Sequence, residues 1–186
     1  MSHFNCLCRV PFVLCCFCLM LGAQSKTPRD KGPRAVVLAF FAQLKAQEYD
    51  KLYEHLPAQL QQQLTREQLV AGLKRLPSFI ELQRMEIGRG QQKDDTAVID
   101  TTIFGTLKQP LKLNGAEVTE GRIVVQQYLV KENGQWKIAT ADERTRAFFL
   151  KRRPEFTQQF QLAPPQLSVK QNGQWQAFGR TMRPER

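Results

Sequence analysis

Cysteine and histidine are nearly missing from most of this chain. All five cysteines lie between Cys6 and Cys18, and of the two histidines only His55 lies beyond the first 23 residues. The remaining sequence therefore predicts no disulfide bond and no thiolate metal site, and we expect neither a metal nor a cofactor. It also lacks glycine-rich nucleotide-binding loops and serine nucleophile motifs, so no catalytic motif indicates an enzyme.

The first 23 residues have the layout of a secretory signal peptide. One cation, Arg9, precedes an apolar run from Val10 to Leu21, and the small residues Gly22 and Ala23 follow. The run is shorter than the roughly 20 residues that cross a membrane, which favours cleavage near Ala23 over an uncleaved membrane anchor. We expect an exported protein, periplasmic or secreted, with a polar linker over residues 24–32.

Positive charge is concentrated at the C-terminal end. The formal net charge of the whole chain is +10, and residues 144–186 hold nine Lys and Arg against two acidic residues. In an exported protein this asymmetry indicates an anionic membrane or cell-wall surface as a partner, and we expect no nucleic acid. A solvated basic tail that only aids solubility explains the pattern equally well.

The apolar periodicity changes from helical to strand-like near residue 78. Before this point Pro33 begins an amphipathic helix, a short helix buries Leu52, and Thr65 and Gln68 form a capping box for a third. After it, alternating apolar residues predict strands at about 79–87, 96–107, 118–132 and 135–141. This order predicts an α+β fold in which N-terminal helices pack on one face of a curved antiparallel sheet.

Two nearly identical heptapeptides occur in the second half, VKENGQW over 130–136 and VKQNGQW over 169–175. Asn-Gly predicts a two-residue type I′ turn in each. The resulting registers place Lys131 opposite Trp136 and Lys170 opposite Trp175. We interpret the pair as one hairpin type used twice, without a repeated domain. The second hairpin has short arms, so we expect it to dock on the domain or on another molecule.

Three stretches resemble a known superfamily: PRAVVLAFFAQLKAQEYDKLYEHL, DDTAVIDTTIF and YLVKENGQWKIATAD. They are similar to the cone-shaped superfamily that includes nuclear transport factor 2 and ketosteroid isomerase, also called SnoaL-like, with many exported bacterial members. The resemblance implies a cone-shaped domain over residues 33–142, followed by a basic extension over 143–186 with a helix and the second hairpin. It implies no single activity, because this fold hosts enzymes, adaptors and binding modules.

An isomerase or dehydratase of this superfamily would need a base and proton donors that converge in the cone. The candidates are Asp100, Tyr53 and His55. Asp100 is expected to face solvent or a neighbouring strand, because the more apolar alternating set begins with Ala97 and Ile99. His55 lies beside the apolar stripe of its helix and is expected to be half-exposed, and Tyr53 is expected at the edge of the core.

The segment after residue 142 combines aromatic and basic residues. We expect a helix that is capped by Asp142, runs to about residue 153 and is continued on its apolar side by two later phenylalanines. The candidate surface-binding residues are Arg144, Lys151, Arg152, Arg153 and Trp175. One interpretation is a segment that lies on an acidic membrane or docks on a partner. The other is that the phenylalanines pack across the open end of the cone while the cations are solvated.

The sequence favours an exported, non-enzymatic binding or adaptor domain that contacts an anionic envelope surface or a partner protein. Two alternatives stay open. One is a small-molecule isomerase or dehydratase that uses Asp100 with a tyrosine in a cone cavity. The other is a structural homodimer, formed through open sheet faces, that binds no ligand.

Overall fold

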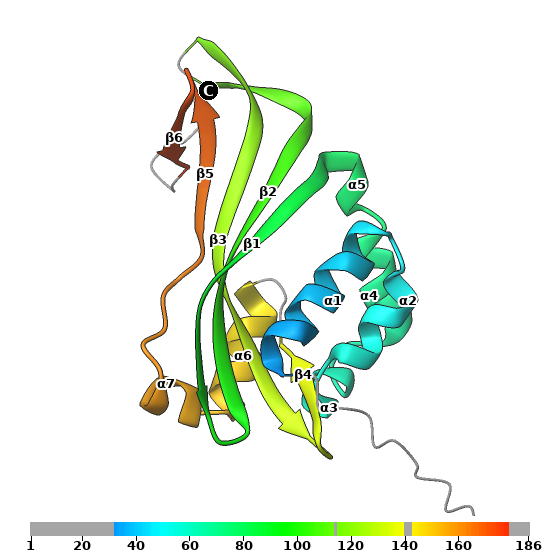
Figure 1. The fold of residues 1–186 in the computed structure, drawn as a ribbon. Helices are drawn as coiled ribbons and strands as arrows, with labels where there is room; N and C mark the ends of the chain where they lie inside the picture. The colour runs from blue at the N-terminus through cyan, green and yellow to red at the C-terminus, as the bar shows by residue number, and fades with distance from the viewer. Residues whose placement is uncertain (1–31, 114, 140–142, 179–186) are drawn as a thin grey trace, which may run out of the picture.

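The computed structural model describes residues 32–113, 115–139 and 143–178, without the side chains of residues 143 and 144. The predicted signal peptide, the linker up to residue 31 and the expected Asp142 cap lie outside the described residues. The N-terminal helices come first, the long strands follow, and two more helices precede the last hairpin (Figure 1). The helices are α1 (Pro33–Lys45), α2 (Tyr49–Leu52), the 3₁₀ turn η1 (Tyr53–His55), α3 (Ala58–Gln61), α4 (Arg66–Leu73), α5 (Leu76–Phe79), α6 (Glu143–Arg152) and α7 (Glu155–Gln159). The strands are β1 (Ile80–Lys93), β2 (Thr96–Leu113), β3 (Ala116–Glu132), β4 (Gln135–Ile138), β5 (Gln166–Gln171) and β6 (Gln174–Ala177).

The N-terminal helices begin where the sequence predicts. Pro33 occupies the first turn of α1, where its missing N–H costs nothing. Thr65 and Gln68 form the predicted capping box of α4: the Gln68 backbone N–H donates to Thr65 Oγ1 and the Thr65 backbone N–H donates to Gln68 Oε1. Pro77 lies in the first turn of the short helix α5, the other position where proline suits a helix. Among the described residues, no helix is long and apolar enough to span a membrane.

The six strands form one antiparallel sheet in the order β1-β2-β3-β5-β6, with β4 also paired to β3. β3 therefore has two neighbours along one edge: β4 pairs near its end and β5 pairs near its middle. Both predicted hairpin registers are confirmed, with Lys131 opposite Trp136 and Lys170 opposite Trp175. The second hairpin docks on the sheet of its own chain through β3 and extends it.

Two strands are longer than predicted. We expected a loop after Ile87 and another after Leu107, but β1 continues to Lys93 and β2 to Leu113. The ladder between β1 and β2 has two irregularities, at Gln83 and at Gly88–Arg89, and β2 has another before Leu111. The prediction was wrong because glycine and proline indicate turns in a local pattern, whereas a β-bulge also accommodates such residues within a strand. Gly88 lies at an irregular position of the edge strand β1, and Pro110 lies beyond Leu107, where β2 no longer pairs with β1.

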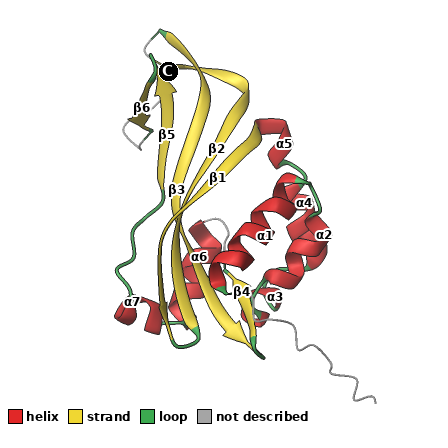
Figure 2. Ribbon diagram, in the orientation of Figure 1, coloured by secondary structure: helices red, strands yellow, loops and turns green. Residues whose placement is uncertain are grey.

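The sheet is covered on both faces over part of its length (Figure 2). One core joins α1, α2 and α4 to residues such as Ile99 and Leu129. The second core places Phe149, Phe156 and Phe160, all nearly inaccessible, against the opposite face with Tyr128. The N-terminal helices α1, α2 and α4 therefore pack on one face, as predicted, and α6 and α7 cover part of the other face. The phenylalanines are buried, as one interpretation of the tail expected, but they pack on this second face and not across the open end of a cone.

The connection from α7 to β5 is fastened to that second face by side chains. Gln126 Oε1 accepts from the Ala163 backbone N–H at 2.8 Å, and Gln126 Nε2 donates to Asp100 Oδ1 at 3.1 Å. Arg146, 9% exposed, donates to the Tyr128 hydroxyl and to the Ala163 carbonyl. These contacts make the described part of the basic extension a structural part of the domain.

Candidate functional site

Helix α1 lies along the open edge of β1, and two basic side chains join them. Arg34 Nη1 donates to the Gly88 carbonyl at 3.0 Å, and Lys45 Nζ donates to the Gln83 carbonyl at 2.6 Å. Both carbonyls belong to the irregular positions of β1. Arg34, Leu38 and Lys45 recur at helical spacing, so they share one flank of α1. Leu38 consequently lies between the two basic residues on this flank.

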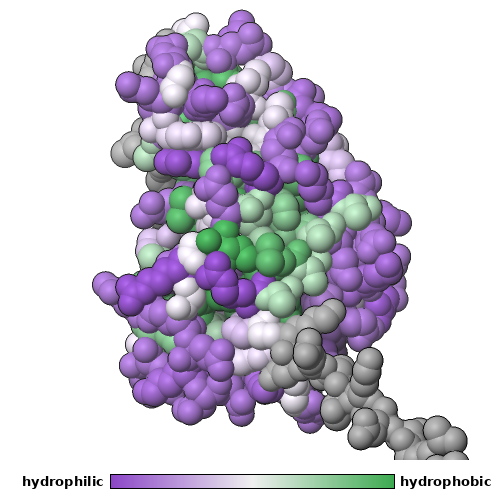
Figure 3. Space-filling model, in the orientation of Figure 1, coloured by the Kyte–Doolittle hydropathy of each residue, from purple (hydrophilic) through white to green (hydrophobic). Residues whose placement is uncertain are grey.

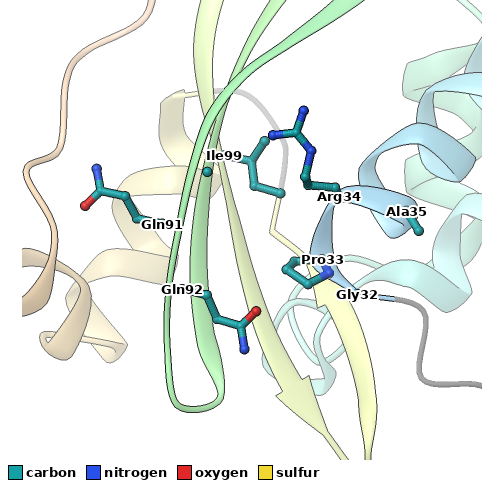
Figure 4. Close-up of a pocket in the computed structure, with 8 residues that line it drawn as sticks. Gly32, Pro33, Arg34, Ala35, Gln91, Gln92 and Ile99 are labelled. Carbon is teal, nitrogen blue, oxygen red and sulfur yellow. The ribbon is translucent and has the colours of Figure 1, made fainter.

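Two pockets lie along this contact, which we call the α1–β1 groove: Arg34, Leu38 and Lys45 of α1 with residues 80–92 of β1. The pocket at the start of α1 has a volume of about 410 Å³ (Figure 4). The pocket at its end has a volume of about 340 Å³. Leu38 lies between them and is 54% exposed. Figure 3 shows an apolar patch on this side of the molecule, between the helices and the sheet.

The lining of the groove suits binding better than acid–base chemistry. The first pocket is lined by backbone of Gly32 and Gly90, by amides and by Ile99, and among its described lining residues only Arg34 is charged. The second pocket contains Lys45, Lys108 and Glu81, and Glu81 is already paired with Lys108 at 2.9 Å. The groove therefore offers an apolar surface with a cation near each end.

The three residues considered for proton transfer each have a separate partner outside the groove. Asp100 is half-buried and, as expected, faces the neighbouring strand, where it accepts from Gln126. The Tyr53 hydroxyl donates to the Gln61 carbonyl at 3.0 Å. Neither pocket of the groove is lined by any of the three residues. The structure thus does not assemble them in this groove.

His55 is half-buried, as expected, and its Nε2 lies 2.9 Å from Gln43 Oε1. Burial lowers the pKa of His55 below its ordinary value, and the charge of Lys137 lowers this pKa further. The unfolded chain therefore takes up the proton first as the pH falls. Stability is complete above the unfolded pKa of about 6.5 and is lost as the pH falls through the folded-state pKa.

We expect His55→Gln to make the free energy of unfolding less dependent on pH below about 6.5 than in the wild type. Urea denaturation at several pH values between about 7.5 and 5 measures this slope. His55 is the only histidine after residue 23, so no other imidazole complicates the comparison. Identical slopes in both proteins would contradict the assigned pKa shift.

The candidate surface residues of the tail have different environments. Lys151 and Arg152 are exposed at the end of α6, where the Arg152 guanidinium lies 4.8 Å from the Phe148 ring centroid. Arg153 forms ion pairs with Glu155 at 3.3 Å and with Glu132 at 3.8 Å. The Arg144 side chain lies outside the described residues. Trp175 docks on its own sheet, with Phe104 and Arg122 as neighbours.

The sequence reasoning missed the groove and Arg122. The spacing of Arg34, Leu38 and Lys45 was present in the sequence, but no local pattern indicates that this helix flank lies beside the first strand, and the predicted strand ended before Gly88, the partner of Arg34. Arg122 carries no local signal, because its relation to Trp175 depends on the pairing of β5 with β3.

The helices, the curved antiparallel sheet and the groove define an α+β protein of the nuclear transport factor 2-like class, which confirms the resemblance seen in the sequence. The family model described as "NTF2-like N-terminal transpeptidase domain" matches residues 32–143, and the chain belongs to this family. The family description associates the domain with transpeptidases. A solution structure of a SEC-C motif containing protein from Rhodopseudomonas palustris is similar at 11% identity and a TM-score of 0.44, covering 59% of this chain and 77% of that chain. No curated protein matches the sequence.

Proposed function

We propose that this protein is an exported, non-enzymatic binding or adaptor domain whose α1–β1 groove receives an apolar segment of a partner protein. The observation that carries the proposal is Leu38, which is 54% exposed between two pockets on the flank of a helix that otherwise packs on the sheet. A family description that associates the domain with transpeptidases supports an accessory role.

The charges at the ends of the groove indicate what the partner segment carries. Arg34 and Lys45 each donate to one uncharged carbonyl, and among the described residues neither has an acidic partner. Each keeps further N–H donors for a ligand. A segment with apolar side chains against Leu38 and carboxylates near its ends would satisfy both the apolar surface and these cations.

The proposal predicts that Leu38→Gln weakens binding of 1-anilinonaphthalene-8-sulfonate by about tenfold, because that apolar anionic dye loses a leucine contact worth about 1.4 kcal/mol. Dye fluorescence titrated against purified protein measures the change. Leu111→Gln is the matched control: Leu111 is 40% exposed but lies at the far end of β2.

Equal effects of the two leucine substitutions would overturn the assignment of the groove. Light scattering on the wild type and on Leu38→Gln tests the alternative partner. A dimer that this substitution converts to a monomer would identify a second copy of the chain as the occupant of the groove. If Asp100→Asn weakened dye binding and Leu38→Gln did not, the isomerase or dehydratase alternative would be restored.

The same proposal includes a contact of the basic tail with an anionic envelope surface. Its support is the exposure of Lys151 and Arg152. Because Phe149, Phe156 and Phe160 are buried in the second core, charge and not aromatic insertion would drive this contact. It should therefore weaken steeply with added salt.

A further inference from the structure

Arg122 and Trp175 form a cation–aromatic cluster on the face of the sheet that also carries Asp100 and Tyr128. The Arg122 guanidinium lies 4.7 Å from the Trp175 ring centroid. The Trp175 and Phe104 centroids are 5.8 Å apart with their rings at 64°. Arg84 lies 3.6 Å over the Phe104 ring. Residues from four strands therefore form one contiguous cluster of two guanidinium groups and two aromatic rings, in which the Phe104 ring is buried beneath Arg84 and beside Trp175.

Pairing in the sheet fixes this arrangement. Arg84, Phe104 and Arg122 are directly opposite one another across β1, β2 and β3, and the row continues to Ser168 of β5. Trp175 of β6 belongs to the next row, opposite Lys170, and reaches back over Arg122. Side chains opposite one another lie on the same face of a sheet. The two arginines are two strands apart, or about 10 Å.

Arg122 lacks the acidic partner that its neighbours have. Lys170 is paired with Glu120 at 3.0 Å, and Arg84 with Glu86 at 3.0 Å. Within the described part of the chain, the Arg122 side chain has no hydrogen bond or ion pair, and its Nε is buried without an acceptor. A half-buried guanidinium whose donors are unused has unmet hydrogen-bonding capacity. An anionic group is the ligand that best meets it.

We propose that this surface binds an anionic glycan, a sugar polymer whose units carry carboxylate or phosphate groups. One anion would pair with Arg122, and the adjoining sugar ring would lie against the indole of Trp175. The flanking pair Arg84–Glu86 is exposed and the pair Lys170–Glu120 is partly exposed, so a polymer could exchange with them at low cost. The inference does not depend on the α1–β1 groove.

The shape of the surface favours a polymer over a lipid membrane. Trp175 is half-buried and held by Phe104 and Arg122, and Phe104 is only 8% exposed. Neither ring protrudes far enough to enter a bilayer, as aromatic side chains at membrane interfaces do. A pleated sheet face with an aromatic ring flanked by polar and charged groups instead suits an extended chain with alternating apolar and anionic parts.

Tryptophan fluorescence provides a direct test, because Trp136 is 5% exposed in the first core and Trp175 is the accessible one of the two tryptophans. The probes are polygalacturonate, a polymer of ribitol phosphate, uncharged dextran, and vesicles of phosphatidylglycerol with phosphatidylcholine. We expect either anionic polymer to change Trp175 emission and dextran to leave it unchanged. Trp175→Phe lacks this fluorescent reporter, so its binding to the polymer is measured by sedimentation.

Arg122→Gln is expected to weaken polymer binding by about tenfold or more, because a charge-assisted hydrogen bond is lost. Arg122→Lys should recover part of the affinity, since it keeps the charge without the planar fork. Arg75→Gln and the double change Lys151→Gln with Arg152→Gln remove exposed cations elsewhere and should have smaller effects. Circular dichroism checks that each variant is folded.

Three results would overturn the proposal. The first is equal binding by dextran and the anionic polymers. The second is equal loss in Arg122→Gln and Arg75→Gln, which would indicate a general charge effect. The third is binding to the vesicles alone, which would assign the anionic contact to a membrane. Loss of polymer binding in Arg122→Gln with unchanged dye binding in the α1–β1 groove would support the two sites separately.

Discussion

Replacing Phe156 by alanine is expected to lower the free energy of unfolding by about 3–5 kcal/mol. Phe156 is 0% exposed, and its ring packs against Tyr128, Phe149 and Phe160 at centroid distances of 5.2–5.7 Å. Truncation removes the apolar contacts and leaves a cavity between α7 and the sheet. The neighbouring rings of Tyr128 in β3 and Phe149 in α6 are held by their own elements, so they cannot move in to fill this cavity. Urea denaturation followed by far-ultraviolet circular dichroism measures the loss.

Phe79→Ala is the matched control for this change. Phe79 is 68% exposed at the end of α5, so its truncation should alter the unfolding free energy by no more than about 0.5 kcal/mol. If Phe156→Ala were as mild as Phe79→Ala, the second core would not contribute to the cooperative unit. In that case α6 and α7 would unfold separately from the sheet.

Replacing Gly105 by alanine is expected to cost about 1–3 kcal/mol, which is the usual penalty for overpacking a core. A Cβ at this position would lie 2.6 Å from two side-chain carbons of Ile80 and 3.0 Å from the Glu81 carbonyl oxygen. The first contact can be relieved only by moving Ile80, and the second involves backbone of the neighbouring strand. The bare backbone of Gly105 thus allows Ile80 to lie flat across β2.

A double-mutant cycle separates this clash from other effects of the substitution. Ile80→Ala removes the colliding atoms, so Gly105→Ala should cost less by about 0.5 kcal/mol or more in that background. Gly72→Ala is the control, because a Cβ at Gly72 in α4 meets nothing within 4 Å. That change should be neutral or stabilising, since alanine is the better helix former. Equal costs of Gly105→Ala in both backgrounds would contradict the packing of Ile80 on β2.

The sequence predicts those parts of the fold that depend on near neighbours along the chain. Asn133-Gly134 and Asn172-Gly173 both have positive φ angles, and these turns alone fix the registers of the two hairpins. The capping box of α4 is equally local. The second core is different, because Phe149 and Phe156 give the same amphipathic pattern whether they cover a sheet face, an open end or a membrane. Only the three-dimensional arrangement distinguishes these environments.

The candidate sites show the same limit. Leu38 is an ordinary apolar residue of α1 in the sequence, and its position beside β1 depends on where an edge strand begins and ends. Arg122 and Trp175 are separated by more than 50 residues and meet through β5. In contrast, the environment of Asp100 was predictable, because strand alternation placed it away from the more apolar set and towards the neighbouring strand.

The two basic side chains of α1 that contact β1 also bear on whether strands of other molecules can pair with the edges of this sheet. Arg34 and Lys45 occupy carbonyls at the two irregular positions of the long outer strand, and the opposite outer strand, β6, has only four residues. Irregular, charged or short edges give little free backbone for another strand to pair with. At high protein concentration, this six-stranded sheet therefore offers few sites where fibril growth could begin. Partners would then bind this sheet through its side chains and not by adding a strand to its edge.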